Sequence, residues 1–338
     1  MGLGAGELTL GKTGVMRIVV IGGTGHIGSY LVPRLLGAGH EVVSMSRGQR
    51  EPYVDHPAWD QVQRAVVDRD AAEAADSFAA EVRDLGPAVV IDLVCFTPDS
   101  AVALVEGLRG HVDHLLHCGS IWRHGPSTKI PVTEDNGSPP QGDYGIAKAA
   151  IARLLADETA RGGLVTTSLH PGHISGPGWP VVNPVGNLDP HPWEVLAGGA
   201  ELVVPGLGAE LMHHVHADDV AQAFALAVEH RDAAAGQSFT VTAASALTVR
   251  GYAGIAAGWF GREPRLRSVS WPEFRTQTSP EWGQSSWEHL SRSQCMSIDK
   301  ARRLLGYSPA YEPEEAAREA VGWLVDHGQL SLDAAFVS

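Results

Sequence analysis

A short strand that runs directly into three spaced glycines is the feature that most restricts the fold of this chain. Residues 17–21 read RIVVI, and Gly22, Gly25 and Gly28 follow before a helical stretch that ends near Gly37. In a strand–turn–helix unit of this kind, the first glycine makes the turn, the second lets the backbone approach a pyrophosphate, and the third lets the helix pack close to the sheet. The N-terminus of the helix then faces the anion. The stretch therefore predicts a dinucleotide-binding turn.

A second phosphate-binding pattern lies just upstream and competes with the first. Residues 6–13 match the P-loop pattern GxxxxGK[ST]. A P-loop needs a buried strand before its glycines and a helix after its lysine, so that backbone amides and the ammonium group converge on phosphate. Here only five residues precede Gly6, and Lys12-Thr13 leads into the strand at 17–21. We therefore disfavour the P-loop and interpret residues 1–15 as a flexible extension.

The composition excludes several classes of function. With 338 residues, 44% apolar and 19% charged, the chain can bury a large core as one big or two interlocked domains. Its 25 basic and 39 acidic residues give a net charge of −14, which repels nucleic-acid backbones and anionic lipids. Cys95, Cys118 and Cys295 form no CxxC pair, and no apolar run is long enough to span a membrane. We therefore expect a cytoplasmic protein with neither nucleic-acid nor membrane partners.

Strand-like and helix-like stretches alternate along the first half of the chain. Further strands are expected at 41–45, 63–67, 88–95, 114–117 and 166–169, with helices at 70–85, 100–108 and 144–161. Strands that alternate with helices form a parallel sheet with right-handed crossovers. The pattern predicts an α/β fold with a Rossmann-type, doubly wound parallel sheet.

The composition changes in the second half of the chain. Residues 171–210 are rich in Pro and Gly, and residues 259–293 carry four tryptophans among Pro, Ser and Gln. These stretches predict a smaller, loop-rich C-terminal lobe that covers the substrate. We expect residues 16–178 to form the dinucleotide-binding domain and residues 179–338 to form most of the substrate lobe, with residues 211–242 packing back onto the first domain.

Five motifs in order resemble one known family. They read GGTGHIG at 22–28, YGIAK at 144–148, PGHISGPG at 171–178, HHVHADDVAQA at 213–223 and SIDKARRLLGYSPAY at 297–311. Together with GHEVVSMSRG after the first helix, they resemble the extended short-chain dehydrogenase/reductase family, also known as the NAD-dependent epimerase/dehydratase family. The resemblance runs from about residue 16 through the rest of the chain, and it implies an NAD(P)-dependent enzyme.

Ser120, Tyr144 and Lys148 are the predicted catalytic residues. A free phenol has a pKa near 10, so a catalytic tyrosine needs a nearby cation. Lys148 follows Tyr144 by one helical turn, and at about 4 Å and an effective dielectric of about 20 the attraction is about 4 kcal/mol. We expect Lys148 to lower the pKa of Tyr144, which would then exchange a proton with the substrate oxygen. The resemblance implies that Lys148 also binds the nicotinamide ribose and that Ser120 hydrogen-bonds the reacting oxygen.

The end of the second strand indicates which cofactor is bound. An acidic residue there would accept from the ribose 2′-OH of NAD, whereas an arginine would hold the 2′-phosphate of NADP. This chain has Ser46-Arg47 at that point, with Arg50 close behind. NADP(H) is therefore favoured over NAD(H), although Arg47 as a solvated loop residue is the open alternative. The expected cofactor-binding residues are Gly22, Thr24, Gly25, His26, Ile27, Gly28, Arg47, Asp68, Arg69, Tyr144 and Lys148, of which Asp68 and Arg69 resemble the family's adenine-contacting position.

Several residues near Ser120 depart from the family pattern. Trp122 and Arg123 replace the usual small and Val residues, and His170 stands where the family often has Arg. These positions and His214 are the candidate substrate contacts, and the departures put a nucleotide-sugar substrate in doubt. The histidines at 111–117 and 213–216 do not converge on one face, so no metal site is expected.

The sequence therefore predicts an oxidoreductase that uses NADP(H) to reduce a ketone or to oxidise a secondary alcohol of a small, sugar-like or secondary-metabolite substrate. Two alternatives stay open: a nucleotide-sugar-type epimerase with tightly held NAD(P), and a non-catalytic scaffold that binds the cofactor. The resemblance also implies a homodimer that packs through the helix carrying Tyr144 and the helix that starts near Ser100.

Overall fold

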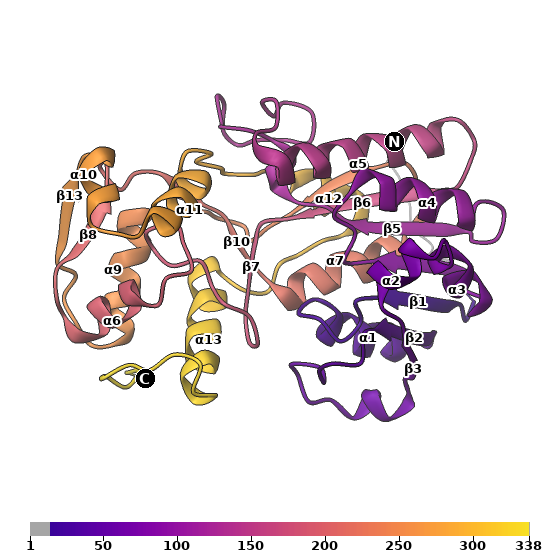
Figure 1. Cartoon of the computed structure of the whole chain (residues 1–338), viewed down its shortest axis with the longest axis horizontal. Coiled ribbons are helices and arrows are strands. Elements are labelled where there is room, and N and C mark those ends of the chain that lie inside the picture. The colour runs from indigo at the N-terminus through magenta and orange to yellow at the C-terminus, as the bar shows by residue number, and fades with distance from the viewer. Residues whose placement is uncertain (1–13, 338) are drawn as a thin grey trace, which may run out of the picture.

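A seven-stranded parallel sheet forms the larger lobe, drawn at the right in Figure 1. The structure is a computed structural model, and it describes residues 14–337. The strand order is β3-β2-β1-β4-β5-β6-β11. The strands are β1 (Arg17–Ile21), β2 (Glu41–Ser46), β3 (Gln63–Val66), β4 (Val89–Asp92), β5 (His114–Cys118), β6 (Thr166–Pro171) and β11 (Ser238–Val241). The winding reverses between β1 and β4, as in a doubly wound sheet, so the predicted Rossmann-type fold is confirmed.

Helices cover both faces of this sheet. They are α1 (Gly28–Gly37), α2 (Arg69–Ala74), α3 (Phe78–Asp84), α4 (Pro98–Leu108), α5 (Gly142–Ala160), α7 (Ala217–Glu229), α8 (Arg231–Ala234) and α12 (Asp299–Leu305). Successive side chains of a strand point to opposite faces. In β1, Ile18 and Val20 therefore pack with α1, α7 and α12, whereas Val19 and Ile21 pack with α3, α4 and α5. Burial on both faces explains why β1 reads as a continuous apolar run.

The smaller lobe, at the left in Figure 1, has its own apolar core. It contains α6 (His191–Gly198), β8 (Leu202–Pro205), α9 (Val249–Trp259), β13 (Leu266–Val269), α10 (Trp271–Thr276), α11 (Pro280–Leu290) and α13 (Pro313–Asp326). The short pair of β7 (His173–Ser175) with β10 (His214–His216) lies between the lobes. The pair of β9 (Leu211–Met212) with β12 (Leu247–Thr248) contributes to the core of the smaller lobe. Two short 3₁₀ helices, η1 (Pro57–Gln61) and η2 (Ile121–Arg123), lie in loops.

Three predicted elements differ from those observed. The helix expected at 70–85 is broken into α2 and α3, because Asp76 adopts a positive φ of 54° between them. The strand expected at 88–95 ends at Asp92, and the residues after it form a pocket wall. The Trp-rich stretch contains two helices, because Ser270 and Ser279 each accept a hydrogen bond at a helix start and a proline occupies the first turn.

Residues from the second half of the chain contribute to the sheet lobe. Strand β11 pairs in parallel with β6, and Arg34 of α1 forms a 2.6 Å ion pair with Asp218 of α7. The exact division into a cofactor domain at 16–178 and a substrate lobe at 179–338 stays a prediction.

The upstream P-loop pattern lies outside the described residues, as does most of the predicted extension at 1–15. The first described element is β1, so residues 14–16 lead into a strand. In the described part of the chain, no helix combines the length and the apolar character that a membrane span requires.

Replacing Gly28 by alanine is expected to destabilise the fold. A Cβ at Gly28 would lie 2.2 Å from the Gly23 carbonyl oxygen, and the three nearest atoms are all backbone atoms of the turn, which leaves little room for adjustment. Overpacking of this kind costs about 1–3 kcal/mol in the free energy of unfolding. Urea denaturation measures this loss.

Gly37→Ala is the matched control. It lies at the other end of α1, where an added Cβ meets nothing within 4 Å. Alanine in a helix is more favourable than glycine by about 1 kcal/mol, so this variant is expected to be neutral or more stable. Equal destabilisation by the two variants would contradict the close approach of α1 to the turn.

Candidate active site

A pocket of about 570 Å³ lies at the carboxyl ends of the central strands. Its walls come from the segments that follow β1 through β6, on both sides of the point where the winding reverses. Ligands of doubly wound sheets bind in this crevice. Of the predicted site residues, the pocket is lined by Gly22, Thr24, Gly25, His26, Ile27, Arg47, Asp68, Arg69, Ser120, Tyr144 and Lys148.

The glycine turn forms one side of the pocket. Gly22 has a φ of +84°, which favours glycine, and its amide donates to the Met45 carbonyl at 2.8 Å. A Cβ at Gly25 would meet only the Gly22 carbonyl oxygen, at 3.0 Å, so its open side faces the pocket. Gly28 does not line the pocket; it allows α1 to approach the turn. The amides of Ser29, Tyr30 and Leu31 donate to carbonyls of the turn, so an anion would be bound by the turn amides that precede them.

His26 follows the second glycine and lines the pocket beside the turn. Its ring stacks on Trp179, with 5.7 Å between centroids and 12° between planes. Burial, together with His216, lowers the pKa of His26 to about 3, so its ring is neutral at physiological pH. Trp179 lies in the loop after β7 and also lines the pocket.

Arg47 is exposed at the rim, directly after β2. The nearby Arg50 guanidinium lies 5.7 Å from the centroid of the Tyr53 ring and donates to the Tyr53 hydroxyl. No acidic residue ends β2, so the pocket offers arginine where an NAD-selective site would place a carboxylate.

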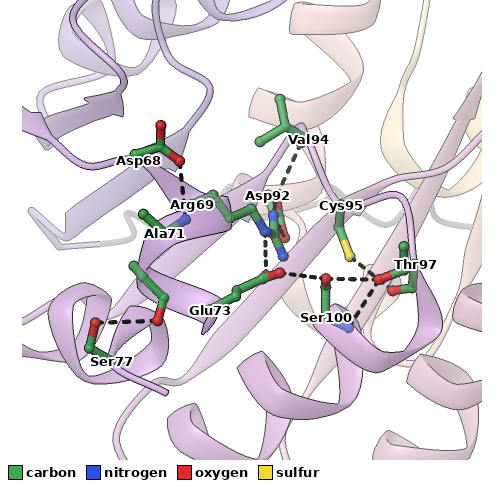
Figure 2. Close-up of polar contacts among 11 residues, drawn as sticks. Asp68, Arg69, Ala71, Glu73, Ser77, Asp92, Val94, Cys95, Thr97 and Ser100 are labelled. Atoms are coloured by element: carbon green, nitrogen blue, oxygen red, sulfur yellow. Dashed lines mark hydrogen bonds and ion pairs between the residues drawn. The ribbon is translucent and has the colours of Figure 1, made fainter. Parts of the chain in front are cut away.

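Asp68 and Arg69 follow β3 and have different roles in the structure. Asp68 caps α2 by accepting from the Ala71 amide at 3.2 Å. Figure 2 shows Arg69 between Glu73 and Asp92: its Nε donates to Glu73 at 2.6 Å and its Nη1 to both Asp92 oxygens at 2.9 Å. Two carboxylates therefore hold Arg69 as a wall of the pocket, and among the described residues its buried Nη2 has no partner.

Ser120, Tyr144 and Lys148 meet on the opposite wall. Ser120 caps η2 by accepting from the Trp122 amide at 3.2 Å, and its side chain also hydrogen-bonds the Tyr144 side chain. Lys148 is 1% exposed, and its ammonium donates to the Cys95 carbonyl at 2.7 Å and to the Cys118 carbonyl at 2.8 Å. Helix α5 carries the predicted phenol and ammonium, and the segment after β5 brings the Ser120 hydroxyl to the same end of the pocket.

The expected effect of Lys148 on Tyr144 is wrong for this structure. Burial raises the pKa of Tyr144 to about 12, and the hydrogen bond from Ser120 offsets only part of that rise. The Lys148 ammonium lies 5.8 Å from the centroid of the Tyr144 ring and is bonded to two carbonyls. The sequence showed the lysine one turn away but not those carbonyls. Tyr144 is therefore a neutral phenol, able to donate a proton at physiological pH.

Of the four candidate substrate residues, only Trp122 borders a pocket near Tyr144. Its ring meets the Tyr144 ring edge-on, with 5.9 Å between centroids. Arg123 and His170 lie behind Ser120: Arg123 Nη1 is 3.0 Å from His170 Nε2, and the Ser120 amide is 3.3 Å from His170 Nδ1. Burial and Arg123 hold the pKa of His170 well below its usual value.

His214 also lies away from the pocket. Its Nδ1 is 2.8 Å from the Ser175 hydroxyl, across the β7–β10 pair, because β10 turns this side chain inward. The structure therefore does not bring Arg123, His170 or His214 to the pocket surface.

Sequence reasoning missed several pocket residues. Phe78 and Phe96 line this pocket, called the cofactor pocket below. The centroid of the Phe96 ring lies 4.8 Å from the Lys148 ammonium. Gly119 allows the His170 ring to approach, since an added Cβ would lie 2.1 Å from His170 Nδ1. Their places in the sequence could have indicated them, because Phe96 and Gly119 closely follow β4 and β5, and ligands bind where such strands end.

The residues fit a dinucleotide. The glycine turn leaves space for a pyrophosphate, Arg47 and Arg50 supply positive charge at the rim, and apolar side chains line the region beside Arg69. Within residues 14–337, no three His, Cys, Asp or Glu side chains are placed to hold a metal ion.

Comparisons with known proteins agree with this geometry. The model of the NAD dependent epimerase/dehydratase family matches residues 18–242. The 2′-dehydrokanamycin reductase of Streptomyces kanamyceticus is 30% identical over 211 residues, which cover 62% of this chain and 57% of that protein. The dTDP-6-deoxy-L-talose 4-dehydrogenase (NAD(P)(+)) of Kitasatospora kifunensis is 26% identical, covering 92% of this chain and 96% of that protein.

A solved structure shares the fold. It is the UDP-glucose 4-epimerase of Stenotrophomonas maltophila with bound NAD and formylated UDP-arabinopyranose, with a TM-score of 0.71 and 19% identity over 93% of this chain and 99% of that chain. The chain therefore belongs to the NAD-dependent epimerase/dehydratase family, within the extended short-chain dehydrogenase/reductases. The predicted family and the predicted NAD(P)-dependent type of enzyme are confirmed at this level.

The raised pKa of Tyr144 can be measured directly. In protein without cofactor, the absorbance difference near 295 nm between wild type and Tyr144→Phe isolates this phenol, because the other tyrosines cancel. We expect this phenol to stay largely protonated at pH 10, where a free phenol is about half ionised. A midpoint near neutrality would instead show that Lys148 controls the phenol without bound cofactor.

Proposed function

We propose that this protein is an NADP(H)-dependent oxidoreductase that reduces a ketone of a small, sugar-like or secondary-metabolite substrate to a secondary alcohol. The observation that carries the proposal is that one pocket joins the glycine turn on one side to Ser120, Tyr144 and Lys148 on the other. The reverse reaction, oxidation of the alcohol, uses the same groups.

Each side chain has a defined task in the proposed reaction. Ser120 donates a hydrogen bond to the substrate carbonyl oxygen, and Tyr144 transfers its phenolic proton to that oxygen as the carbon is reduced. A bound nicotinamide supplies the hydride to the carbonyl carbon. Lys148 holds α5 against the strand ends and places its positive charge near the phenolate that forms. Because the pKa of Tyr144 is about 12, the protonated phenol needed for reduction dominates at neutral pH.

The preference for NADP(H) follows from charge at the rim. Arg47 is exposed at the end of β2, and Arg50 lies close by. Guanidinium groups bind phosphate through charge-assisted hydrogen bonds. The 2′-phosphate of NADP(H) would bind there.

The relatives support a reductase but leave two alternatives. An epimerase would oxidise and re-reduce the same carbon, keep its cofactor bound and consume no NADPH overall. A scaffold would bind cofactor and catalyse nothing. A homodimer through α4 and α5 and a cytoplasmic location stay predictions from the sequence.

Arg47→Ala tests the cofactor preference. We expect the dissociation constant for NADPH to rise about 10- to 100-fold, because a charge-assisted hydrogen bond contributes about 1.5–3 kcal/mol. Binding of NADH should change little. Fluorescence titration of both cofactors measures this, with Arg83→Ala, on α3 and outside the pocket, as the control. An unchanged preference for NADPH would remove Arg47 from the proposal.

Tyr144→Phe tests the reaction. Loss of a general acid reduces kcat by about 10²- to 10⁴-fold, while the dissociation constant for NADPH should change little. The assay follows NADPH absorbance with a panel of ketosugars. Full activity in the variant would contradict the role of Tyr144, and isomerisation without net NADPH oxidation would favour the epimerase.

A further inference from the structure

Two further pockets extend from Tyr144 toward the smaller lobe. The first, about 250 Å³, lies between the start of α5 and α11, and its lining includes Trp122 and Tyr144. The second, about 520 Å³, shares Gln141, Trp287 and Ser291 with the first. Tyr144 lines both the first of these pockets and the cofactor pocket. We name the two pockets together the outer cleft; under the proposed function, a substrate whose carbonyl reaches Tyr144 extends into it.

Three tryptophans shape the outer cleft. Trp122 lies beside Tyr144, and Trp271 and Trp287 meet edge-on at 5.0 Å between centroids. Trp287 is 42% exposed although it is a large apolar side chain. Indole faces suit the apolar C–H faces of sugar or cyclitol rings and also attract cations.

The charge that faces the outer cleft is negative. Asp143 and Glu288 are exposed, and they line the first pocket, while Glu210 lines the second. Among the described residues none of the three forms an ion pair, and Glu210 Oε2 is buried without a hydrogen-bond partner. A carboxylate without a cationic partner makes this wall of the second pocket electronegative.

The positively charged side chain that lines the outer cleft is buried in its wall. Arg292 is the one Lys or Arg among the described residues that line the two pockets. It is 4% exposed, its guanidinium lies 3.9 Å from the centroid of the Trp122 ring, and its Nη2 donates to the Gln141 carbonyl at 2.8 Å. Its Nη1 donates to the Glu288 carbonyl. In the first pocket a nucleoside diphosphate would meet Asp143 and Glu288; the exposed guanidinium of Arg275, which lines neither pocket, lies 5.7 Å from the centroid of the Trp287 ring.

From this arrangement we infer that the outer cleft is a substrate subsite for a cationic, polyhydroxylated ring compound, an amino sugar or aminocyclitol. Its rings stack on Trp122 and Trp287, and its ammonium groups bind Asp143, Glu210 and Glu288. This inference rests on the proposed function for the position of the carbonyl at Tyr144, but it makes a separate claim about charge. It excludes nucleoside-diphosphate sugars as the preferred substrates.

The test is a binding experiment on the full chain saturated with NADP⁺. The probes are the β-1,4-linked disaccharide of glucosamine, its neutral di-N-acetyl form and UDP-glucose, titrated by calorimetry and by tryptophan fluorescence. We expect the amine disaccharide to bind at least about tenfold more tightly than either other probe. Added salt should weaken it, because exposed charges are screened.

Charge-removing variants locate the subsite. Glu288→Gln and Glu210→Gln should each weaken the amine disaccharide about five- to tenfold and leave the di-N-acetyl form unchanged. Glu281→Gln is the matched control, since Glu281 is exposed on the same helix outside both pockets. Because Glu288 is exposed, its variant stays informative even if Glu210→Gln fails to fold.

The inference is overturned if UDP-glucose binds more tightly than the amine, or if Glu288→Gln binds the amine as wild type does. Repeating the titrations in Tyr144→Phe separates the two proposals, because this variant loses proton transfer but keeps the carboxylates. If the wild type binds the amine in a charge-dependent way but reduces no ketone, the subsite is supported and the proposed reductase function is contradicted. Ketone reduction together with tighter binding of UDP-glucose than of the amine supports the reductase and overturns the subsite.

Discussion

The buried ammonium of Lys148 is the contact on which the candidate site depends. An unpaired charge in a protein interior is costly, and here two backbone carbonyls compensate it. The carbonyls belong to Cys95, just beyond β4, and Cys118, the last residue of β5. One side chain therefore ties α5 to the ends of two neighbouring strands. The same contact positions Tyr144, one helical turn earlier on α5, in the wall of the cofactor pocket.

The opposite wall depends on close backbone approach. Gly28 lets α1 lie against the Gly23 carbonyl, which directs the start of the helix at the space between β1 and β4. The net charge of −14 argues against polyanion partners for the protein as a whole. Under the proposed function, an anionic cofactor would be held locally by the glycine turn and by Arg47 and Arg50. The negative net charge of the protein and the positive charge of the arginines at the pocket rim thus act on different ligands.

The sequence predicted those features that are local in the chain. Strand β1, the glycine turn and the Tyr144–Lys148 spacing each depend on neighbouring residues, and so they could be read directly. The partners of Lys148 lie 53 and 30 residues away, and no local pattern identifies them. The pKa of Tyr144 was misjudged for the same reason, since it depends on burial by distant segments. His170 was expected at the substrate because it stands where the family often has Arg, but β6 turns its ring behind Ser120.

The division of charge around Tyr144 connects the two halves of the molecule. On one side lie arginines and the glycine turn, which suit phosphates, and on the other lie exposed carboxylates and indole rings. Tyr144 is 42% exposed and lines pockets on both sides, so it is the point where cofactor and substrate can meet. Opposite local charges favour a different ligand on each side, because each is repelled from the other's site. The fold supplies the first side through its strand ends, whereas the second comes from α5 and α11, which lie far apart in the chain. Substrate choice can therefore change through α11 without disturbing the wall held by Lys148.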